Sequence, residues 1–465
     1  MSNTSAGQAL TEGMLRRVLA AGAIGTALEW YDFYAYATAS ALVFNKLFFP
    51  ELSPLAGTLA SFATLGLGFF ARPVGGLFFG HLGDRIGRKP VLVMTLIIVG
   101  VGTTLIGLLP TYSQIGILAP ILLLVLRLLQ GFATGAEYSG AIIMAAEYAP
   151  PGRRGLITSI PALGVAGGNV LSAGVFAIIT FVWKDELVEW AWRIPFLLSA
   201  VLVVVGLYIR MRVRETPAFS VAATKQKLVR FPIVRAVSSY KKSFLIVIFA
   251  QIGQNGLAYM FNVFGLNYIT ATLGMPKSVG LMALLIATVV QLFTIVSVGL
   301  LSDKYGRRPV YIGAALITGL MAFPFFWMVG TKEVAFICAA FVMASGIGYA
   351  GMLGAQPAFF VELFGTSARF SGFAFAREVG TLIGGAPVPL ISVALVAWMD
   401  GQPWGVAIYI IILASITMIA VALSPETFRK DIAAEPLEPA PSGPDLSADL
   451  ALSPTAGLNR VPPNP

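Results

Sequence analysis

Long stretches of mostly apolar residues run through this chain, and they constrain its fold more than any other feature. A bilayer core roughly 30 Å thick is crossed by a helix of about 20 apolar residues. Only 11% of the 465 residues are charged, compared with about a quarter in soluble domains. We therefore expect an all-α integral membrane protein with 12 transmembrane helices, at about residues 18–43, 58–80, 91–109, 115–147, 155–182, 192–211, 243–272, 279–301, 310–330, 334–361, 371–398 and 404–424.

Basic residues are distributed unevenly between the loops that join these segments. If the N-terminus is cytoplasmic, the loops on that side hold most of the Arg and Lys residues, and the outer loops hold only Lys46, Lys184, Lys277 and Lys332. Cytoplasmic loops of membrane proteins carry such an excess. We therefore expect a multi-pass protein of the cell inner or plasma membrane with both termini in the cytoplasm. The net charge of +9 is then an orientation signal, and nucleic acid is not an expected partner.

The composition between the apolar segments predicts two halves. We expect a cytoplasmic N-terminus at 1–17, a first six-helix bundle at 18–211, a basic cytoplasmic connector at 212–242 and a second six-helix bundle at 243–424. Residues 425–465 are rich in Pro, Ala and acidic residues and predict a disordered cytoplasmic tail.

Two short loops repeat one pattern and support this division. "GHLGDRIGRKPV" (80–91) returns as "GLLSDKYGRRPV" (299–310), and "EYAPPGRRG" (147–155) corresponds to "ELFGTSARFSG" (362–372). Parallel repeats of six helices place a substrate path between the two halves. The acidic residues of such loops can bind a helix N-terminus or a cation of the opposite half. A loop that only sets orientation is the alternative. We predict gating roles for Asp84, Arg85, Arg88, Asp303, Arg307, Glu147, Arg154, Glu362 and Arg369.

Charged residues deep inside the apolar segments are the candidates for chemistry, because a charge in the bilayer core usually faces a cavity or a partner. Helical rise places Glu29, Asp32, Arg72 and Arg127 near one level of the membrane. An arginine can receive a carboxylate with two parallel hydrogen bonds. A buried carboxylate can alternate between protonated and charged forms. We predict proton coupling by Glu29, Asp32 and Glu137 and substrate binding by Arg127 and Arg72; an ion network that only joins helices is the alternative.

Amide and hydroxyl groups mark a second candidate region. "QIGQNGLAYMFNVF" (251–264) carries too many of them for a helix that faces lipid, although they could also join helices. We predict substrate binding by Gln251, Gln254, Asn255, Tyr259, Gln130 and Tyr31. In "FAREVG" (375–380), Arg377 and Glu378 are interpreted as structural residues that pair with the Asp84 loop or with their own surroundings.

Several motifs resemble a known family. The two repeated loops resemble the signature of the major facilitator superfamily, and "RLLQGFATGA" (127–136) resembles its fourth-helix motif, which accompanies proton-coupled carriers there. "GTALEWYDFYAY" (25–36), "WRIPFLLS" (192–199) and "RETPAF" (214–219) are similar to the metabolite:proton symporter family, whose members carry shikimate, α-ketoglutarate, citrate, or proline with betaine. Relatives often have an aromatic residue and Gln where this chain has Arg377 and Glu378.

The function expected from these residues and this resemblance is secondary transport. With one His and one Cys, the chain lacks the residues for a metal or nucleophile–base site, and it has no GxxxxGK[ST] loop. We expect import of a small organic acid, shikimate-like or a dicarboxylate, by proton symport through alternating access. The proton gradient supplies the energy and no cofactor is expected. A proline/betaine osmolyte carrier and an uncoupled facilitator are the alternatives.

Overall fold

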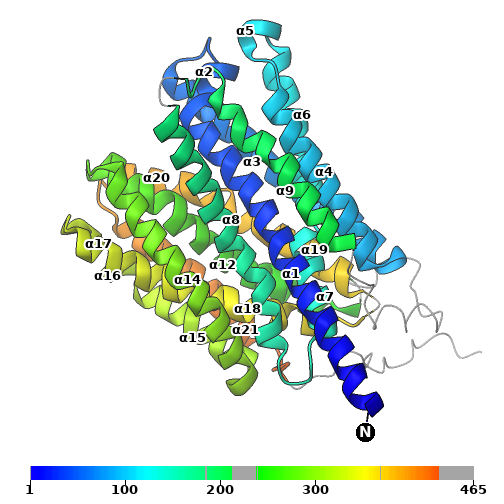
Figure 1. Ribbon diagram of the computed structural model, residues 1–465. Coiled ribbons are helices and arrows are strands. Elements are labelled where there is room, and N and C mark those ends of the chain that lie inside the picture. The colour runs from blue at the N-terminus through cyan, green and yellow to red at the C-terminus, as the bar shows by residue number, and fades with distance from the viewer. Residues whose placement is uncertain (1, 184–185, 212–236, 238, 367, 429–465) are drawn as a thin grey trace, which may run out of the picture. The chain divides into compact units, whose positions relative to one another are not determined.

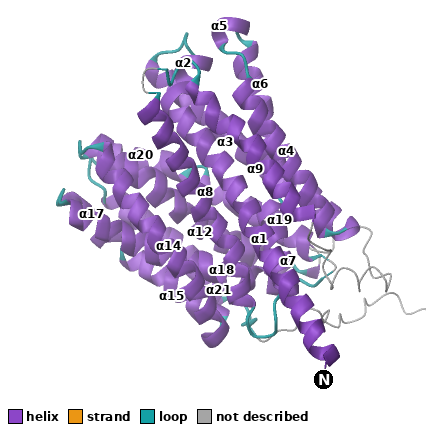
Figure 2. Ribbon diagram, in the orientation of Figure 1, coloured by secondary structure: helices purple, strands orange, loops and turns teal. Residues whose placement is uncertain are grey.

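The computed structural model describes residues 2–183, 186–211, 237, 239–366 and 368–428. Most of the predicted connector at 212–242 and of the predicted tail at 425–465 lies outside these residues. All regular elements in the described part of the chain are helical (Figure 2). The described helices belong to one compact unit, residues 1–433.

The helices of the N-terminal half follow the predicted segments closely (Figure 1). They are α1 (Ser2–Ala39), α2 (Asn45–Phe48), α3 (Pro54–Ile86), α4 (Arg88–Leu108), α5 (Tyr112–Ile115), α6 (Leu118–Thr134), α7 (Glu137–Tyr148), α8 (Arg154–Val182) and α9 (Ile194–Met211). Because α1 starts at Ser2, the helix begins well before residue 18, so the segment expected as a cytoplasmic N-terminus continues the first helix.

The C-terminal half repeats this order with more interruptions. Its helices are α12 (Lys241–Tyr259), α13 (Gly265–Asn267), α14 (Lys277–Tyr305), α15 (Arg307–Leu320), α16 (Ala322–Gly330), α17 (Val334–Phe341), α18 (Ala350–Glu362), α19 (Arg369–Gly385), α20 (Val388–Trp398) and α21 (Trp404–Ala422). Turns of π-helix join α12 to α13 and α17 to α18, at Met260–Phe264 and Val342–Tyr349. Such turns keep two helices in one continuous helical stretch.

The apolar helices agree with the predicted membrane-spanning segments. In the described residues, 10 helical stretches are long and apolar enough to cross a membrane, and the bent pair α15 and α16 would be one more. The helix α1 covers the first predicted segment, but it does not pass the same test of length and hydropathy. It contains Glu29 and Asp32, which lower its hydropathy.

Helix packing follows the same scheme in both halves. In the N-terminal half α1 packs against α8, α3 against α6, and α4 against α9. In the C-terminal half α12 packs against α19, α14 against α18, and α15 against α21. The repeated loops also share one backbone geometry, because Gly87 has a φ of 104° and Gly306 a φ of 102°. These values lie in a region that glycine adopts readily and other residues rarely do.

The two halves contact each other through α3 with α19 and through α8 with α14 and α18. Glycines allow these close approaches. A Cβ atom on Gly80 would lie 2.9 Å from the Cα atom of Ser371, and one on Gly299 would lie 2.8 Å from the carbonyl oxygen of Gly155. Small residues at such positions let helix backbones approach closely in membrane proteins.

Candidate functional site

Two of the predicted charges form an ion pair between α1 and α3. Arg72 donates from Nη2 to Oε1 of Glu29 at 3.2 Å, and both side chains are buried. The guanidinium carbons of Arg72 and Arg127 lie 5.9 Å and 5.3 Å from the centre of the Phe33 ring. The first, second and fourth predicted segments therefore bring these charges to one level, as the spacing predicts.

Arg127 differs from Arg72 in its partners. Its Nη1 donates to Oε1 of Gln130 at 3.3 Å, and its guanidinium carbon lies 4.6 Å from the centre of the Tyr36 ring. Its Nε has no hydrogen-bond partner in the described part of the chain. Among the residues that the structure describes, no carboxylate lies within 4.0 Å of this buried guanidinium. Arg127 is thus a buried cation held by neutral groups.

Asp32 is buried beside α9. It accepts a hydrogen bond from Oγ of Ser199 at 2.9 Å. It interacts electrostatically with Arg127 without forming an ion pair. Gln130, which holds Arg127, donates to Oγ1 of Thr103 at 2.6 Å. Asp32 and Arg127 are therefore opposite charges that attract each other without direct contact.

Glu137 has a different environment from the other predicted proton-coupling residues. It forms an ion pair with Arg210 of α9 and accepts a hydrogen bond from Thr95 at 2.7 Å. Arg210 also donates to the carbonyl oxygen of Leu92. Arg210 was not singled out from the sequence, so this buried partner was missed. It stands at the end of a predicted apolar segment, where a basic residue can either orient the helix or pair with a buried carboxylate.

Arg377 and Glu378 of α19 lie next to the charges of the N-terminal half. The two side chains pair with each other, and Oε2 of Glu378 lies 3.8 Å from Nη1 of Arg72. The guanidinium carbon of Arg377 lies 4.1 Å from the centre of the Tyr138 ring. The expected alternative of a contact with the Asp84 loop is wrong, because Asp84 binds Phe370 and Ser371, about two helical turns away.

The amide groups predicted in the seventh segment join three helices. Gln356 of α18, which the sequence analysis did not single out, donates to Gln251 at 2.7 Å and to Gln254 at 3.3 Å. Gln251 donates to Oγ1 of Thr381 at 3.0 Å, and Asn255 donates to the Thr381 carbonyl at 3.3 Å. In this conformation the amides bind one another, as expected of residues that join helices.

The two tyrosines predicted to bind substrate have different positions. Tyr31 donates to the carbonyl oxygen of Pro195 at 2.7 Å, so its hydroxyl is engaged within the N-terminal half. Tyr259 packs edge-on against Phe69 of α3, with ring centres 5.8 Å apart. Its buried hydroxyl has no hydrogen-bond partner among the described residues. Tyr259 therefore brings a spare polar group from the C-terminal half to the level of Arg72.

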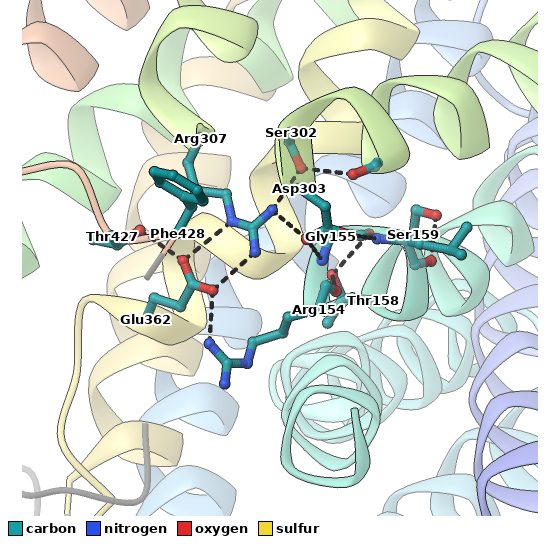
Figure 3. A network of polar contacts seen from close by, with 12 residues as sticks. Arg154, Gly155, Thr158, Ser159, Ser302, Asp303, Arg307, Glu362, Thr427 and Phe428 are labelled. Atoms are coloured by element: carbon teal, nitrogen blue, oxygen red, sulfur yellow. Dashed lines mark hydrogen bonds and ion pairs between the residues drawn. The ribbon is translucent and has the colours of Figure 1, made fainter. Parts of the chain in front are cut away.

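The repeated loops lie at one end of the helices, which we call the loop end. Asp303 joins the two halves there. Its Oδ1 accepts from the backbone N–H of Gly155 at 2.7 Å, and its Oδ2 from that of Leu156 at 2.8 Å (Figure 3). These are first-turn groups of α8, whose N–H groups have no partner within the helix. Arg307 holds Asp303 at 2.7 Å. A carboxylate at this position is stabilised by the helix dipole.

Glu362 extends this network across the same boundary. It receives Arg307 at 3.1 Å from its own half and Arg154 at 3.0 Å from the other half (Figure 3). Thr427 donates to Glu362 at 2.7 Å, and Glu426 accepts from the backbone N–H of Arg307 at 2.9 Å. The prediction assigned both residues to the disordered tail. The ordered structure therefore continues past residue 424.

Asp84 makes the equivalent contact in the other direction. It accepts from the backbone N–H groups of Phe370 and Ser371 at 3.2 Å and 2.8 Å, in the first turn of α19. Its partner on the next helix is Arg88, at 3.7 Å. Each loop aspartate thus caps a helix of the opposite half, which is one of the two contacts that the sequence analysis predicted.

Glu147 completes this second network. It receives Arg88 at 3.5 Å from its own half and Arg369 at 2.8 Å from the other half. Arg85 is exposed, and in the described part of the chain it forms no ion pair. The predicted gating residues other than Arg85 therefore meet in two matching networks that join the halves at the loop end.

This architecture can be compared with that of known proteins. The family model described as Major Facilitator Superfamily matches residues 22–374 and 255–457. The chain belongs to the major facilitator superfamily. It is 38% identical to the shikimate transporter of Escherichia coli K12 over 420 residues, which cover 89% of this chain and 95% of the relative. It is 34% identical to the proline/betaine transporter of Salmonella typhimurium, over 91% of this chain and 86% of that one.

A solved structure has the same fold. The proton:xylose symporter bound to 6-bromo-6-deoxy-D-glucose superimposes with a TM-score of 0.69, at 17% sequence identity, over 91% of this chain and 98% of the symporter. The superfamily member described here is therefore a multi-pass membrane transporter with the major facilitator fold, as predicted, and not an enzyme.

Proposed function

We propose that this transporter imports a small organic acid together with protons across the cytoplasmic membrane, without a cofactor. The observation that carries this proposal is the buried Arg127, which has no carboxylate partner among the described residues. A buried cation with no carboxylate in direct contact is costly, so a substrate carboxylate at Arg127 would be stabilised strongly. The E. coli relative named a shikimate transporter supports an organic acid as the substrate.

Charge balance explains why a proton would accompany the acid. Glu29, Asp32, Arg72 and Arg127 contribute equal numbers of negative and positive charges. A substrate carboxylate adds one negative charge in a region of low dielectric constant, and a proton on Asp32 removes one. Anion and proton therefore favour each other's binding. Asp32 is the better proton site than Glu137, because Glu137 is already held by Arg210.

Alternating access would use the two networks at the loop end. We infer from the Lys and Arg excess that this end is cytoplasmic and that both chain ends lie there. Asp84 and Asp303 then hold the cytoplasmic side closed in this conformation. Release of the acid into the cell requires both aspartates to leave the helix N-termini of the opposite half. An E. coli relative named an inner membrane metabolite transport protein is 37% identical to this chain, which supports the cytoplasmic membrane as the location of this transporter.

Uptake into proteoliposomes tests this proposal. Labelled shikimate, α-ketoglutarate and proline are offered separately, with an inward proton gradient, without a gradient, and with an uncoupler. We expect gradient-driven uptake of an acid, abolished by the uncoupler and by Asp32→Asn. Equal uptake with and without the proton gradient would indicate an uncoupled facilitator. Uptake of proline alone would favour an osmolyte carrier, which the proline/betaine relative at 34% identity makes the second candidate.

A further inference from the structure

A four-residue charge chain crosses from one half to the other beside Arg127. Glu29 pairs with Arg72 at 3.2 Å, Arg72 lies 3.8 Å from Glu378, and Glu378 pairs with Arg377. The signs alternate, so two positive and two negative charges balance. Arg377 and Glu378 are 4% and 1% exposed, so this balance is maintained within the protein interior and not by solvent.

The charge chain is not saturated with hydrogen bonds. Among the described residues, partners are missing for four buried atoms around it: Oε2 of Glu29, Oε2 of Glu378, Nε of Arg377 and the hydroxyl of Tyr138. Buried polar atoms in proteins usually have partners, because leaving one without a hydrogen bond costs about 1–3 kcal/mol. These two spare donors, Nε of Arg377 and the Tyr138 hydroxyl, belong to side chains in contact, since the guanidinium carbon lies 4.1 Å from the centre of the Tyr138 ring. Their chemistry fits a carboxylate.

We propose that Arg377 and Tyr138 form a second anion position of the transport site, which takes the second acidic group of a dicarboxylate and which Glu378 occupies in the empty carrier. This proposal rests on the proposed function, in which Arg127 takes the first carboxylate. Arg377 lies on the C-terminal half and Arg127 on the N-terminal half. A dicarboxylate would therefore be held by both halves, and its binding would be sensitive to their relative movement.

Entry of the second carboxylate requires neutralisation of Glu378. A proton from the medium on the Glu378 carboxylate frees the Arg377 guanidinium, and the substrate carboxylate replaces the lost negative charge. In the described part of the chain, the charged and titratable groups that interact with Glu378 or Arg377 are Arg72, Glu29, Tyr138, Tyr259 and Tyr349. With one proton on Asp32 and one on Glu378, each dicarboxylate would enter with two protons.

Competition binding to the purified full-length protein tests this inference. Labelled α-ketoglutarate is displaced either by unlabelled α-ketoglutarate or by 2-oxopentanoate, which has the same chain length but one carboxylate. We expect the wild type to prefer the dicarboxylate by about tenfold or more, the value of one charge-assisted contact. The double variant Arg377→Gln/Glu378→Gln keeps the charge balance and should lose that preference while its affinity for 2-oxopentanoate is unchanged. Because the label is then weakly bound, the variant is also measured directly with labelled 2-oxopentanoate.

The matched control is Lys332→Gln/Glu333→Gln, an exposed neighbouring pair of the same charges, which should bind as the wild type does. Glu378→Gln alone mimics the protonated residue and should bind α-ketoglutarate about fivefold or more tightly at neutral pH, with less dependence on pH. A double variant that still prefers the dicarboxylate, or that loses both ligands equally, would overturn the inference. A wild type that binds α-ketoglutarate and 2-oxopentanoate equally would also overturn the inference, but the proposed organic-acid transport would then stand. A wild type that binds neither acid overturns the second anion position, and the proposed function is overturned with it only if labelled shikimate also fails to bind.

Discussion

Replacing Asp303 with alanine is expected to open the loop end of the transporter. The variant loses two charge-assisted hydrogen bonds to the first turn of α8, at 2.7 Å and 2.8 Å, both of which cross between the halves. Each such bond contributes about 1.5–3 kcal/mol. A loss of about 3 kcal/mol would change the ratio of closed to open molecules by roughly a hundredfold. Arg307 would also lose one carboxylate partner and would keep Glu362.

Labelling of a buried cysteine measures this opening. Ser159 is fully buried on α8 beside α14, and Ser159→Cys in a Cys338→Ser background provides a single thiol. In inside-out vesicles, a maleimide should label this thiol at least about tenfold faster when Asp303→Ala is added, because the labelling rate follows the open population.

Glu426→Ala is the matched control for this experiment. Glu426 accepts from the backbone N–H groups of Arg307 and Arg308 at 2.9 Å and 3.0 Å, so it caps α15 within its own half. The same chemistry is lost, but no direct contact between the halves is removed. Equal labelling rates in Asp303→Ala and Glu426→Ala would contradict a gating role for Asp303.

Replacing Arg210 with alanine is expected to destabilise the protein strongly. Among the described residues, the substitution leaves the buried Glu137 with Thr95 as its remaining hydrogen-bond partner. Removal of one member of a buried ion pair typically costs about 3–5 kcal/mol. We expect the midpoint of thermal unfolding in detergent to fall by about 5 °C or more. Arg210→Met combined with Glu137→Gln should recover much of this loss, because no unpaired charge remains.

This pair also separates two roles for Glu137. If Glu137 only joins α7 to α9, Glu137→Gln should retain proton-driven uptake wherever the protein remains folded. Loss of uptake with an unchanged unfolding midpoint would instead assign proton coupling to Glu137. An unfolding midpoint of Arg210→Ala equal to that of the wild type would contradict the structural role of the pair.

Features with a regular sequence period could be predicted well. The apolar segments correspond closely to helices, because the need to satisfy backbone hydrogen bonds in lipid leaves few alternatives. The repeated loops around Gly87 and Gly306 share one backbone geometry. Asp84 and Asp303 were expected to bind either a helix N-terminus or a cation of the opposite half, and they lie at helix N-termini.

Side-chain partners inside the membrane could be predicted only in part. Helical rise places residues at a depth but does not define which neighbouring helix they face. Arg72 and Glu29 were expected at one depth, but their ion pair was not specified, and Arg127 has no ion-pair partner among the described residues. Gln356 is a single amide in an apolar segment, and only the packing of α18 against α14 and α12 identifies it as a partner of Gln251.

Proton entry measured together with acid entry tests the central claim most directly. Proteoliposomes containing a pH-sensitive dye are given whichever of shikimate and α-ketoglutarate supports the greater uptake, with no initial pH gradient. The account predicts internal acidification that begins with acid entry and is absent with Asp32→Asn. Acid uptake by the wild type without acidification would contradict proton symport.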